Sequence, residues 1–522
     1  METLNRRISL VLFSLAVPAA ILIGQLMSFQ FRLNPSINDF ERTTSEREAV
    51  IQTIAANRGQ IYDREGVVLA VNSFQYRVGV SPALVLDRRE AATELARLLD
   101  LDESELYRQF QPNLDGRYTP YLQIAGPVDN RTAQAVEDLD LNGVVIEPVA
   151  LRRYPQGDLF SQLLGFVNYS ERGFFGIEGQ YDATLAGTSR QVEAANSPFN
   201  IDEVPDARDG QDLILTVDRD VQFVVEDVLH NAILEQQARG GTIIVMNPRT
   251  GEILGMMSRI LDEAGTTTVL PNGSGDVAYN PAVGEIYEPG SVIKVVTAAI
   301  ALQASLPGLD LNWTYNNQGC FVQGGVQICD WDRVPKGAVD FRRCIIDSLN
   351  TCTATWYSLL GPSNVYPVLQ EFGFGTPTGI DLEGEEGGIL NLITDPTWSE
   401  ANFLNISYGQ GISSTALQML NAVNAIANDG LLMQPHIVHA RRDGEQIFEV
   451  TPNPVSRPIS AEVANAVTEI MVQTLRPGTL DAVADVEGYT IAGKTGTSQQ
   501  IVGGALLQHR VLGVFYWLPA RR

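Results

Sequence analysis

The sequence predicts an α+β protein with an N-terminal transmembrane helix, a mixed and turn-rich first domain, and a second domain built on a mainly antiparallel sheet. Three observations support this fold class. A long charge-free apolar run lies near the start of the chain, a polar and acidic stretch ends near residue 210, and β-rich runs then flank several helical patterns. Strands at both ends of a domain with helices between them favour helices packed on one sheet.

The apolar run at residues 8–31 is long enough to cross a bilayer as a helix. Arg6 and Arg7 precede it, which predicts a cytoplasmic tail at residues 1–7 and an extracytoplasmic bulk. A cleaved signal peptide is the alternative, but its apolar core is usually only about 7–15 residues long and a small-residue cleavage site follows it. Here the small residues lie inside the run, so we expect an uncleaved single-pass anchor in the cell membrane.

The composition narrows the functional classes. The chain has 522 residues and a net charge of −26, which argues against a nucleic-acid surface because such a surface needs basic patches. The chain has only three lysines, at Lys294, Lys336 and Lys494. A desolvated lysine can act as a base, whereas arginine cannot. A lysine-poor genome would explain the scarcity, but not why two of the three lie in candidate catalytic motifs.

The first domain, which we call the pedestal, is predicted at residues 32–210. After a polar stalk, IYDREGVVLAV at residues 61–71 predicts a hairpin, because D-R-E-G separates two apolar runs. Residues 83–110 predict a helix with acids and arginines on one side.

The second domain is predicted at residues 211–522. Residues 218–239 predict a helix, residues 240–258 predict a hairpin around N-P-R-T-G, and two late runs predict further strands. The apolar residues expected along one face of the helix are Val221, Val224, Val225, Val228 and Ile233.

Four cysteines lie late in the chain. Cys320 and Cys329 flank a predicted hairpin, so outside the membrane they could pair. Cys344 and Cys352 lie on one predicted helix and are too far apart along its axis to bond each other, so we expect small core residues instead. No cysteine spacing suggests a zinc site, and we expect no metal.

The segment YEPGSVIK contains the first candidate catalytic pair, Ser291 and Lys294. Pro289 and Gly290 interrupt the chain just before an apolar helix, so Ser291 is expected at the helix N-terminus, where negative charge is favoured. Lys294 lies three residues later on the same face. A buried lysine beside a hydroxyl is typical of a general base beside a nucleophile.

A second pair, Ser348 and Asn350, forms an S-L-N motif that on its own is no more than a helix cap or a polar contact. The third motif, GYTIAGKTGTS, matches both G-x-x-x-x-G-K-T of phosphate-binding loops and K-T-G of penicillin-recognising enzymes. A phosphate loop must open a helix, but no helical pattern follows Lys494. We therefore predict that residues 488–498 form a strand.

The order S-V-I-K, S-L-N, K-T-G-T is that of β-lactamases and penicillin-binding proteins. Other segments carry the resemblance further: NRGQIYDREGVVLA, RRYPQGDLFSQLLGFVN and GIEGQYDATLAGT in the pedestal, and YGQGISSTALQ and AGKTGTSQ in the second domain. Over nearly its whole length the chain resembles class B penicillin-binding proteins, the peptidoglycan D,D-transpeptidases. Soluble β-lactamases lack the anchor and the pedestal.

The resemblance implies a role for each motif residue. Ser291 would be the nucleophile and Lys294 its base, with Ser348 relaying a proton and Asn350 positioning Lys294 and the substrate. The backbone N–H groups of Ser291 and Thr497 would form the oxyanion hole. The residues implied to bind the substrate are Lys494, Thr495, Gly496 and Thr497. Gly496 would leave room for the peptide along the strand.

The same resemblance implies stem peptides of peptidoglycan as substrates and β-lactams as inhibitors, with no cofactor. It also implies a membrane glycosyltransferase partner from the elongation or the division machinery, without choosing between them. One departure is that the family normally continues beyond VLGVFYWLPARR with another strand and a C-terminal helix, so we expect a domain lacking both. A D,D-carboxypeptidase, or an inactive truncated scaffold or β-lactam sensor, stays open as an alternative.

Overall fold

The computed structural model describes residues 51–54, 56–168, 170–193, 208–261, 267–268, 280–323, 325–476, 479, 489–502 and 505–518. The predicted anchor at residues 8–31 lies outside these ranges. Within them, no helix is both long enough and apolar enough to span a membrane. The contacts divide the chain into two units, and in the described part of the smaller one β1 (Ile51–Ile54) pairs antiparallel with β8 (Arg190–Glu193).

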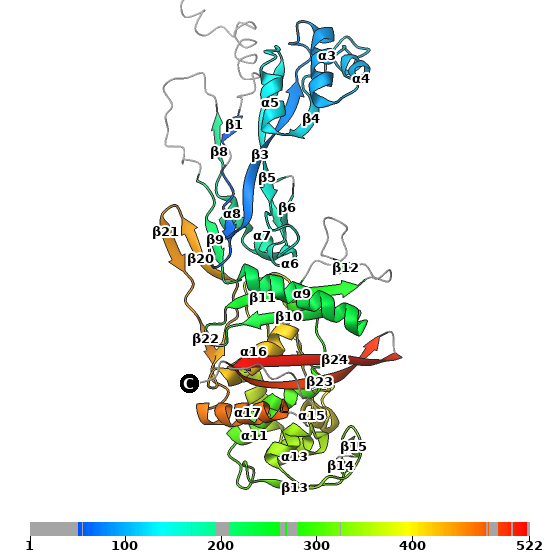
Figure 1. Ribbon diagram of the computed structural model, residues 1–522, viewed down its shortest axis with the longest axis vertical. Coiled ribbons are helices and arrows are strands. Elements are labelled where there is room, and N and C mark those ends of the chain that lie inside the picture. Colours follow the sequence, from blue (N-terminus) through cyan, green and yellow to red (C-terminus); the bar gives the residue numbers. More distant parts are fainter. Residues whose placement is uncertain are drawn as a thin grey trace, which may run out of the picture. The chain divides into compact units, whose positions relative to one another are not determined.

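The larger unit contains a seven-stranded sheet whose long central strand is β3 (Val68–Val80). The predicted hairpin is confirmed, because β2 (Ile61–Tyr62) pairs antiparallel with β3 and Ile61 lies opposite Ala70. Towards its outer end β3 pairs with both β4 (Leu122–Val128) and β5 (Val144–Arg153), as Figure 1 shows.

Strands from the predicted second domain extend the same sheet. β9 (Asp212–Leu215) runs parallel to β2, and β20 (Val438–Asp443) pairs antiparallel with β9 and with β21 (Gln446–Glu449). The sheet therefore continues across residue 210, where the sequence placed the domain boundary.

The helix predicted at residues 83–110 is two helices, α3 (Arg88–Leu99) and α4 (Glu103–Gln109). Asp100 ends α3 in the left-handed region with φ 55°, and the Asp102 side chain accepts a hydrogen bond from Glu105 N to start α4. The acidic residues that the pattern placed on a helix face therefore include the residues that divide it. Both helices and α5 (Asn130–Glu137) pack on a small core over β3 and β4.

Short elements complete the pedestal. They are α6 (Ser161–Leu164), β6 (Phe166–Val167), β7 (Gly173–Phe174), α7 (Gly176–Gln180) and α8 (Asp182–Ala186).

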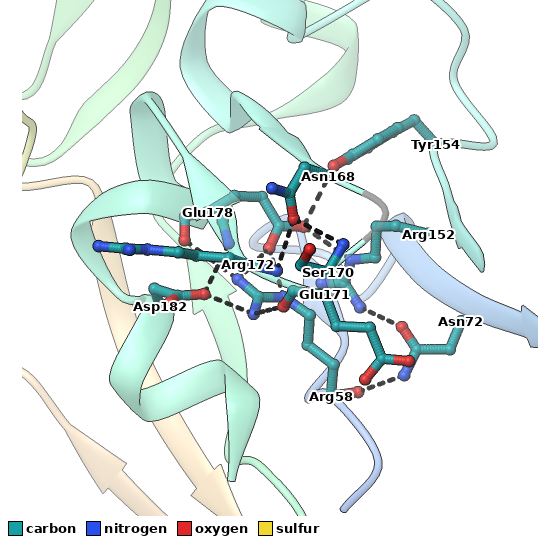
Figure 2. Close-up of polar contacts among 11 residues, drawn as sticks. Arg58, Asn72, Arg152, Tyr154, Asn168, Ser170, Glu171, Arg172, Glu178 and Asp182 are labelled. Atoms are coloured by element: carbon teal, nitrogen blue, oxygen red, sulfur yellow. Dashed lines mark hydrogen bonds and ion pairs between the residues drawn. The ribbon is translucent and has the colours of Figure 1, made fainter. Parts of the chain in front are cut away.

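Three pedestal segments that carry the family resemblance meet in one buried ionic cluster, which Figure 2 shows. Glu178 is fully buried, and its two carboxylate oxygens lie 2.7 Å from Arg58 Nη2 and 2.7 Å from Arg152 Nε. Arg58 Nη1 lies 2.7 Å from Asp182 Oδ1. Burial, together with the charge of Glu178, raises the pKa of Tyr154 far above its ordinary value, so this phenol stays neutral. The cluster fixes α7 and α8 against the strands.

In the second domain, the predicted helix α9 (Arg219–Gln236) and the predicted hairpin of β10 (Gly240–Met246) and β11 (Ile253–Leu261) are both present, and α9 packs on the hairpin (Figure 1). The strand β12 (Thr267–Thr268) pairs with β11. The expected apolar face of α9 was partly wrong. The helix buries Val225 and Ile233 with Gln222 and Leu229, whereas Val224 is 57% exposed and Val228 is 49% exposed.

A large helical core fills the rest of this domain. Its helices are the 3₁₀ helix η1 (Gly290–Ile293), α11 (Lys294–Gln303), α12 (Phe341–Ile346), α13 (Asn350–Leu360), α14 (Pro362–Glu371), α15 (Glu400–Ile406), α16 (Ala416–Ala427) and α17 (Ala461–Thr474). The short α10 (Pro281–Gly284) belongs to a second core, which it shares with β2, β9 and β11.

Four short strand pairs border these helices. They are β13 (Thr314–Asn317) with β16 (Gly337–Asp340), β14 (Cys320–Gln323) with β15 (Val326–Cys329), β17 (Ile389–Leu390) with β18 (Ile412–Ser413), and β19 (Leu432–Met433) with β22 (Pro454–Ser456).

The two late strand predictions are confirmed. β23 (Thr490–Val502) pairs antiparallel with β24 (Ala505–Leu518), and the two strands run side by side in Figure 1. Lys494 lies in β23 opposite Val514, within a strand and not at the start of a helix. The phosphate-loop interpretation of GYTIAGKTGTS therefore lacks the local structure it requires.

Candidate active site

The first motif occupies a tight turn that opens a buried helix. Gly290, at φ 57°, begins η1, and Ser291 follows it half-buried, while Lys294 starts α11 with none of its surface exposed. The apolar residues on all sides of α11 explain this burial, because the helix lies within the core. The prediction that Ser291 lies at the helix start and Lys294 one turn further is confirmed.

Glycines bring two other segments against this turn. A side chain on Gly409, in the YGQG segment, would place its Cβ 2.0 Å from the Gly290 carbonyl oxygen, and Gly290 N donates to Gly409 O at 3.1 Å. A Cβ on Gly290 would lie 2.5 Å from the Thr497 carbonyl oxygen. Both glycines also have positive φ angles, so other residues are disfavoured there by conformation as well as by space. The turn that carries Ser291 therefore lies directly beside Thr497.

The second motif meets the first through Lys294. Its Nζ donates to the Ser348 carbonyl oxygen at 2.6 Å, to Ser348 Oγ at 3.1 Å and to Asn350 Oδ1 at 2.7 Å. These three acceptors are a carbonyl, a hydroxyl and an amide oxygen, which hold the amine in place. Residues more than 50 positions apart in the sequence thus converge on one nitrogen, and the contact of Asn350 with Lys294 is the one that the family resemblance implied.

The local structure around Ser348 corrects the sequence analysis. The single helix expected to carry both Cys344 and Cys352 is interrupted, because α12 ends at Ile346 and α13 begins at Asn350. Ser348 lies between them with φ 55°, a left-handed conformation that is uncommon for a residue with a side chain. This turn is what directs both its hydroxyl and its carbonyl oxygen to Lys294.

The same interruption overturns the prediction for the second cysteine pair. Cys344 and Cys352 form a disulfide with Cα atoms 5.8 Å apart. The prediction assumed one continuous helical axis, but the two residues lie on different helices, one on each side of the turn. The disulfide therefore closes the short loop that contains Ser348 and Asn350.

The first cysteine pair is confirmed as a disulfide. Cys320 and Cys329 lie opposite each other in the β14–β15 hairpin. The carbonyl oxygen of Cys329 accepts a hydrogen bond from Asn350 Nδ2 at 2.9 Å, a contact that sequence reasoning missed. The cysteine spacing predicted the hairpin, but no local pattern connects it to a residue 21 positions later.

The third motif lies along η1. The Cβ of a side chain on Gly496 would lie 2.6 Å from Val292 Cγ2 and 3.0 Å from Val292 N. Gly496 therefore has a packing role that the sequence did not predict, because η1 fills the space that a side chain would need. The role of Gly496 towards a substrate stays a prediction. Lys494 is 1% exposed and its Nζ donates to the Thr495 carbonyl oxygen at 3.0 Å, while Thr497 is exposed.

The YGQG segment also has a defined polar environment. Gly411 N donates to Glu288 Oε1 at 2.7 Å, which joins this segment to the residues before Ser291. Burial, with a smaller contribution from the charge of Glu288, raises the pKa of Tyr408 to about 12, so its phenol is neutral at physiological pH. Within the ranges that the structure describes, no group of three or more His, Cys, Asp or Glu residues could hold a metal ion.

Comparison with known proteins agrees with this geometry. Residues 241–515 match the penicillin-binding protein transpeptidase domain. The chain belongs to this transpeptidase family. Residues 53–215 match the penicillin-binding protein dimerisation domain, so the mixed α+β architecture of both parts is that of the family.

Individual relatives cover most of the chain. Stage V sporulation protein D of Bacillus subtilis is 30% identical over 97% of this chain and 78% of its own length. A probable peptidoglycan D,D-transpeptidase, PenA, of Neisseria meningitidis is 28% identical over 99% of this chain and 87% of its own length. The crystal structure of penicillin-binding protein 3 of Mycobacterium tuberculosis with aztreonam has a TM-score of 0.65 and 26% identity, covering 89% of this chain and 85% of that one.

Proposed function

We propose that this protein is a peptidoglycan D,D-transpeptidase that acts through an acyl-enzyme on Ser291. The observation that carries the proposal is the environment of Lys294. A fully buried amine, one helical turn from an accessible serine, donates to Ser348 and Asn350 beside a strand that carries a second buried lysine. Nucleophile, base and anion-binding strand are the parts that acyl transfer to a peptide needs.

The chemistry balances with these residues alone. Lys294 takes the proton of Ser291 as its oxygen attacks the penultimate D-Ala carbonyl of a stem peptide. The backbone N–H groups of Ser291 and Thr497 hold the oxyanion. The bond to the terminal D-Ala then breaks, and the proton held by Lys294 passes through Ser348 to the leaving amine. The amine of a second stem peptide attacks the ester and gives a proton to Lys294, and as the ester bond to Ser291 breaks, Lys294 returns that proton to the Ser291 oxygen.

Substrate binding follows the same assignment. Lys494, Thr495 and Thr497 bind the terminal carboxylate, and the peptide lies along β23 as an added strand. Asn350 orients Lys294 and the substrate amide. A β-lactam resembles the D-Ala-D-Ala end and acylates Ser291 in the same way, but its ring prevents the leaving group from departing.

The domain assignment follows the predicted boundaries. Residues 1–7 are a cytoplasmic tail, residues 8–31 a membrane anchor, residues 32–210 the non-catalytic pedestal and residues 211–522 the transpeptidase domain. The two disulfides support an extracytoplasmic location, because disulfides persist in oxidising compartments. A membrane glycosyltransferase would supply the glycan strands that this domain crosslinks.

Labelling of the full-length chain in detergent with a fluorescent penicillin tests the proposal. We expect one adduct per chain, mapped by mass spectrometry to Ser291, and none in Ser291→Ala. A folded wild-type protein that forms no adduct would overturn the proposal.

A second assay separates a transpeptidase from a carboxypeptidase. The chain is given a thioester analogue of the stem peptide together with a D-amino acid as amine acceptor. We expect the aminolysis product to accumulate as the acceptor concentration rises. Release of the free acid alone, at every acceptor concentration, would assign the carboxypeptidase activity instead.

A further inference from the structure

A buried carboxylate outside the three motifs caps the helix that presents Asn350. The helix α13 begins at Asn350, and its N-cap residue, Leu349, has no polar side-chain atom to offer. The carboxylate of Asp330 takes this place from another segment. Its Oδ1 accepts from Thr351 N at 3.0 Å, and its Oδ2 accepts from Thr351 Oγ1 at 3.0 Å. Negative charge is stabilising at this end of a helix.

Asp330 is itself held in a fixed position. It is 2% exposed, its Oδ2 also accepts from Asn317 Nδ2 at 2.6 Å, and its backbone N–H donates to the Gly319 carbonyl oxygen at 2.8 Å. Asn317, fully buried, in turn accepts from Gly319 N at 3.1 Å and from Lys336 N at 3.0 Å. The network leaves Asp330 little freedom to move relative to the start of α13.

The residue before Asp330, Cys329, contacts Asn350 directly. Cys329, fixed in the hairpin by its disulfide to Cys320, accepts from Asn350 Nδ2, and Asn350 Oδ1 accepts from Lys294 Nζ. Two adjacent residues thus fix the start of α13, Asp330 through Thr351, the residue after Asn350, and Cys329 through the side chain of Asn350.

We propose that Asp330, with the disulfide-closed hairpin that carries it, is a positioning residue that sets the place of Asn350 and, through it, of Lys294. The carboxylate does not contact the reacting atoms. Its contribution is to keep the amide oxygen of Asn350 2.7 Å from the amine of Lys294 while Ser291 reacts. This inference rests on the proposed function, because it concerns how fast Ser291 is acylated.

The test compares Asp330→Asn with Asp340→Asn in the full-length chain. Asp340 is a matched control, since its exposed carboxylate caps the neighbouring helix α12 by accepting from Arg343 N at 2.7 Å. Stopped-flow labelling with a fluorescent penicillin gives the acylation rate constant at saturation and the dissociation constant separately. We expect Asp330→Asn to lower that rate constant about tenfold to a hundredfold with an unchanged dissociation constant, as small displacements in catalytic sites do. Asp340→Asn should leave the rate constant unchanged.

A swap distinguishes positioning from general loss of structure. In Asp330→Asn combined with Asn317→Asp, the amide and the carboxylate exchange places, and Thr351 again has a partner for its N–H and its hydroxyl. We expect the double variant to recover most of the lost rate, to within about threefold of wild type, because the coupled pair is restored. Should Asp330→Asn not fold, Thr351→Val removes one donor to Asp330, and we expect a fall of several-fold in the same rate constant.

The outcomes separate this inference from the proposed function. If the wild-type chain is not acylated on Ser291, the proposed function and the positioning role of Asp330 are both overturned. If it is acylated and the folded Asp330 variant reacts at the wild-type rate, only the positioning role is overturned. An Asp330 variant that labels a smaller fraction of chains at an unchanged rate also overturns it, because that result is a loss of folded protein.

Discussion

Two buried clusters in this chain, each built around an ionisable side chain, differ in the kind of partner that surrounds that side chain. In the pedestal, the fully buried Glu178 has each carboxylate oxygen against an arginine, and Arg58 has a second carboxylate in Asp182. In the transpeptidase domain, the fully buried Lys294 donates to a carbonyl, a hydroxyl and an amide oxygen. The first cluster pairs charge with charge, whereas these three contacts of the second hold an amine by neutral oxygens.

The difference follows from what each cluster must do. A buried cluster of paired charges suits a structural role, because removing one member leaves a buried charge without compensation. The amine of Lys294 lies one helical turn from Ser291 and is the base proposed to take its proton. The pedestal cluster is therefore expected to govern stability, and the Lys294 cluster to govern reaction rate.

The largest effect is expected from Lys294→Met, which keeps the length and apolar stem of the side chain but removes the base. Penicillin acylation of Ser291 should fall by about 10²–10⁴-fold, the usual contribution of a general base. The free energy of unfolding should not fall by a comparable amount, because the substitution also removes the cost of burying the amine. Labelling kinetics measure the acylation rate, and urea unfolding of the same preparation measures the free energy of unfolding.

The outcome that would contradict the comparison is a Lys294→Met variant that unfolds readily and, in its folded fraction, still reacts at the wild-type rate. That result would make Lys294 a structural residue like those of the pedestal cluster. Lys336→Met is the matched control, since Lys336 is the one lysine of the chain outside the three catalytic motifs and its Nζ lies 2.5 Å from Asp332 Oδ2 at the surface. Lys336→Met should leave the acylation rate and the free energy of unfolding unchanged.

The second effect is expected from Glu178→Gln. Loss of this carboxylate leaves Arg58 and Arg152 buried without their shared counter-charge, which typically costs about 3–5 kcal/mol of unfolding free energy. Glu94→Gln is the control, because the Glu94–Arg97 pair has the same 2.7 Å separation at the surface and should contribute less than about 1 kcal/mol. Denaturant unfolding measures both variants.

Equal unfolding free energies for Glu178→Gln and Glu94→Gln would show that burial does not distinguish the two pairs. A variant at Glu178 that remained folded and lost acylation would also break the comparison. The folded fraction is therefore labelled with penicillin at the end of each series.

The sequence predicted those parts of the fold and the site that short patterns determine. Pro289 and Gly290 before an apolar run gave the helix start at Ser291, and the cysteine-flanked run gave the β14–β15 hairpin. The short patterns could not predict contacts between segments that are distant in the sequence. Nothing local indicates that the Cys329 carbonyl accepts from Asn350, or that Thr497 lies beside Gly290.

Two errors have the same physical origin. The pattern at residues 341–361 is helical on both sides of Ser348, so propensity alone did not show the left-handed turn there. The valines of α9 were assigned to one face by spacing, but what is buried depends on the strands that pack against the helix. Val224 and Val228 therefore stay exposed while Gln222 is buried and donates to the Met256 carbonyl oxygen.

The smallest of the three effects is expected from the disulfide that closes the loop around Ser348. Cys344→Ala with Cys352→Ala opens a cross-link between residues eight apart, and loop-closure entropy gives a loss of about 2.5 kcal/mol in unfolding free energy. The Cys320→Ala, Cys329→Ala variant, with a separation of nine, is the matched comparison and should lose a similar amount. Thermal melting of both double variants, with and without a phosphine reductant, measures the losses. Wild-type protein that melts at one temperature in either condition would show that neither bridge contributes. In that case the dipoles around Lys294 are held by packing and hydrogen bonds alone, as the pedestal cluster is held by its ion pairs.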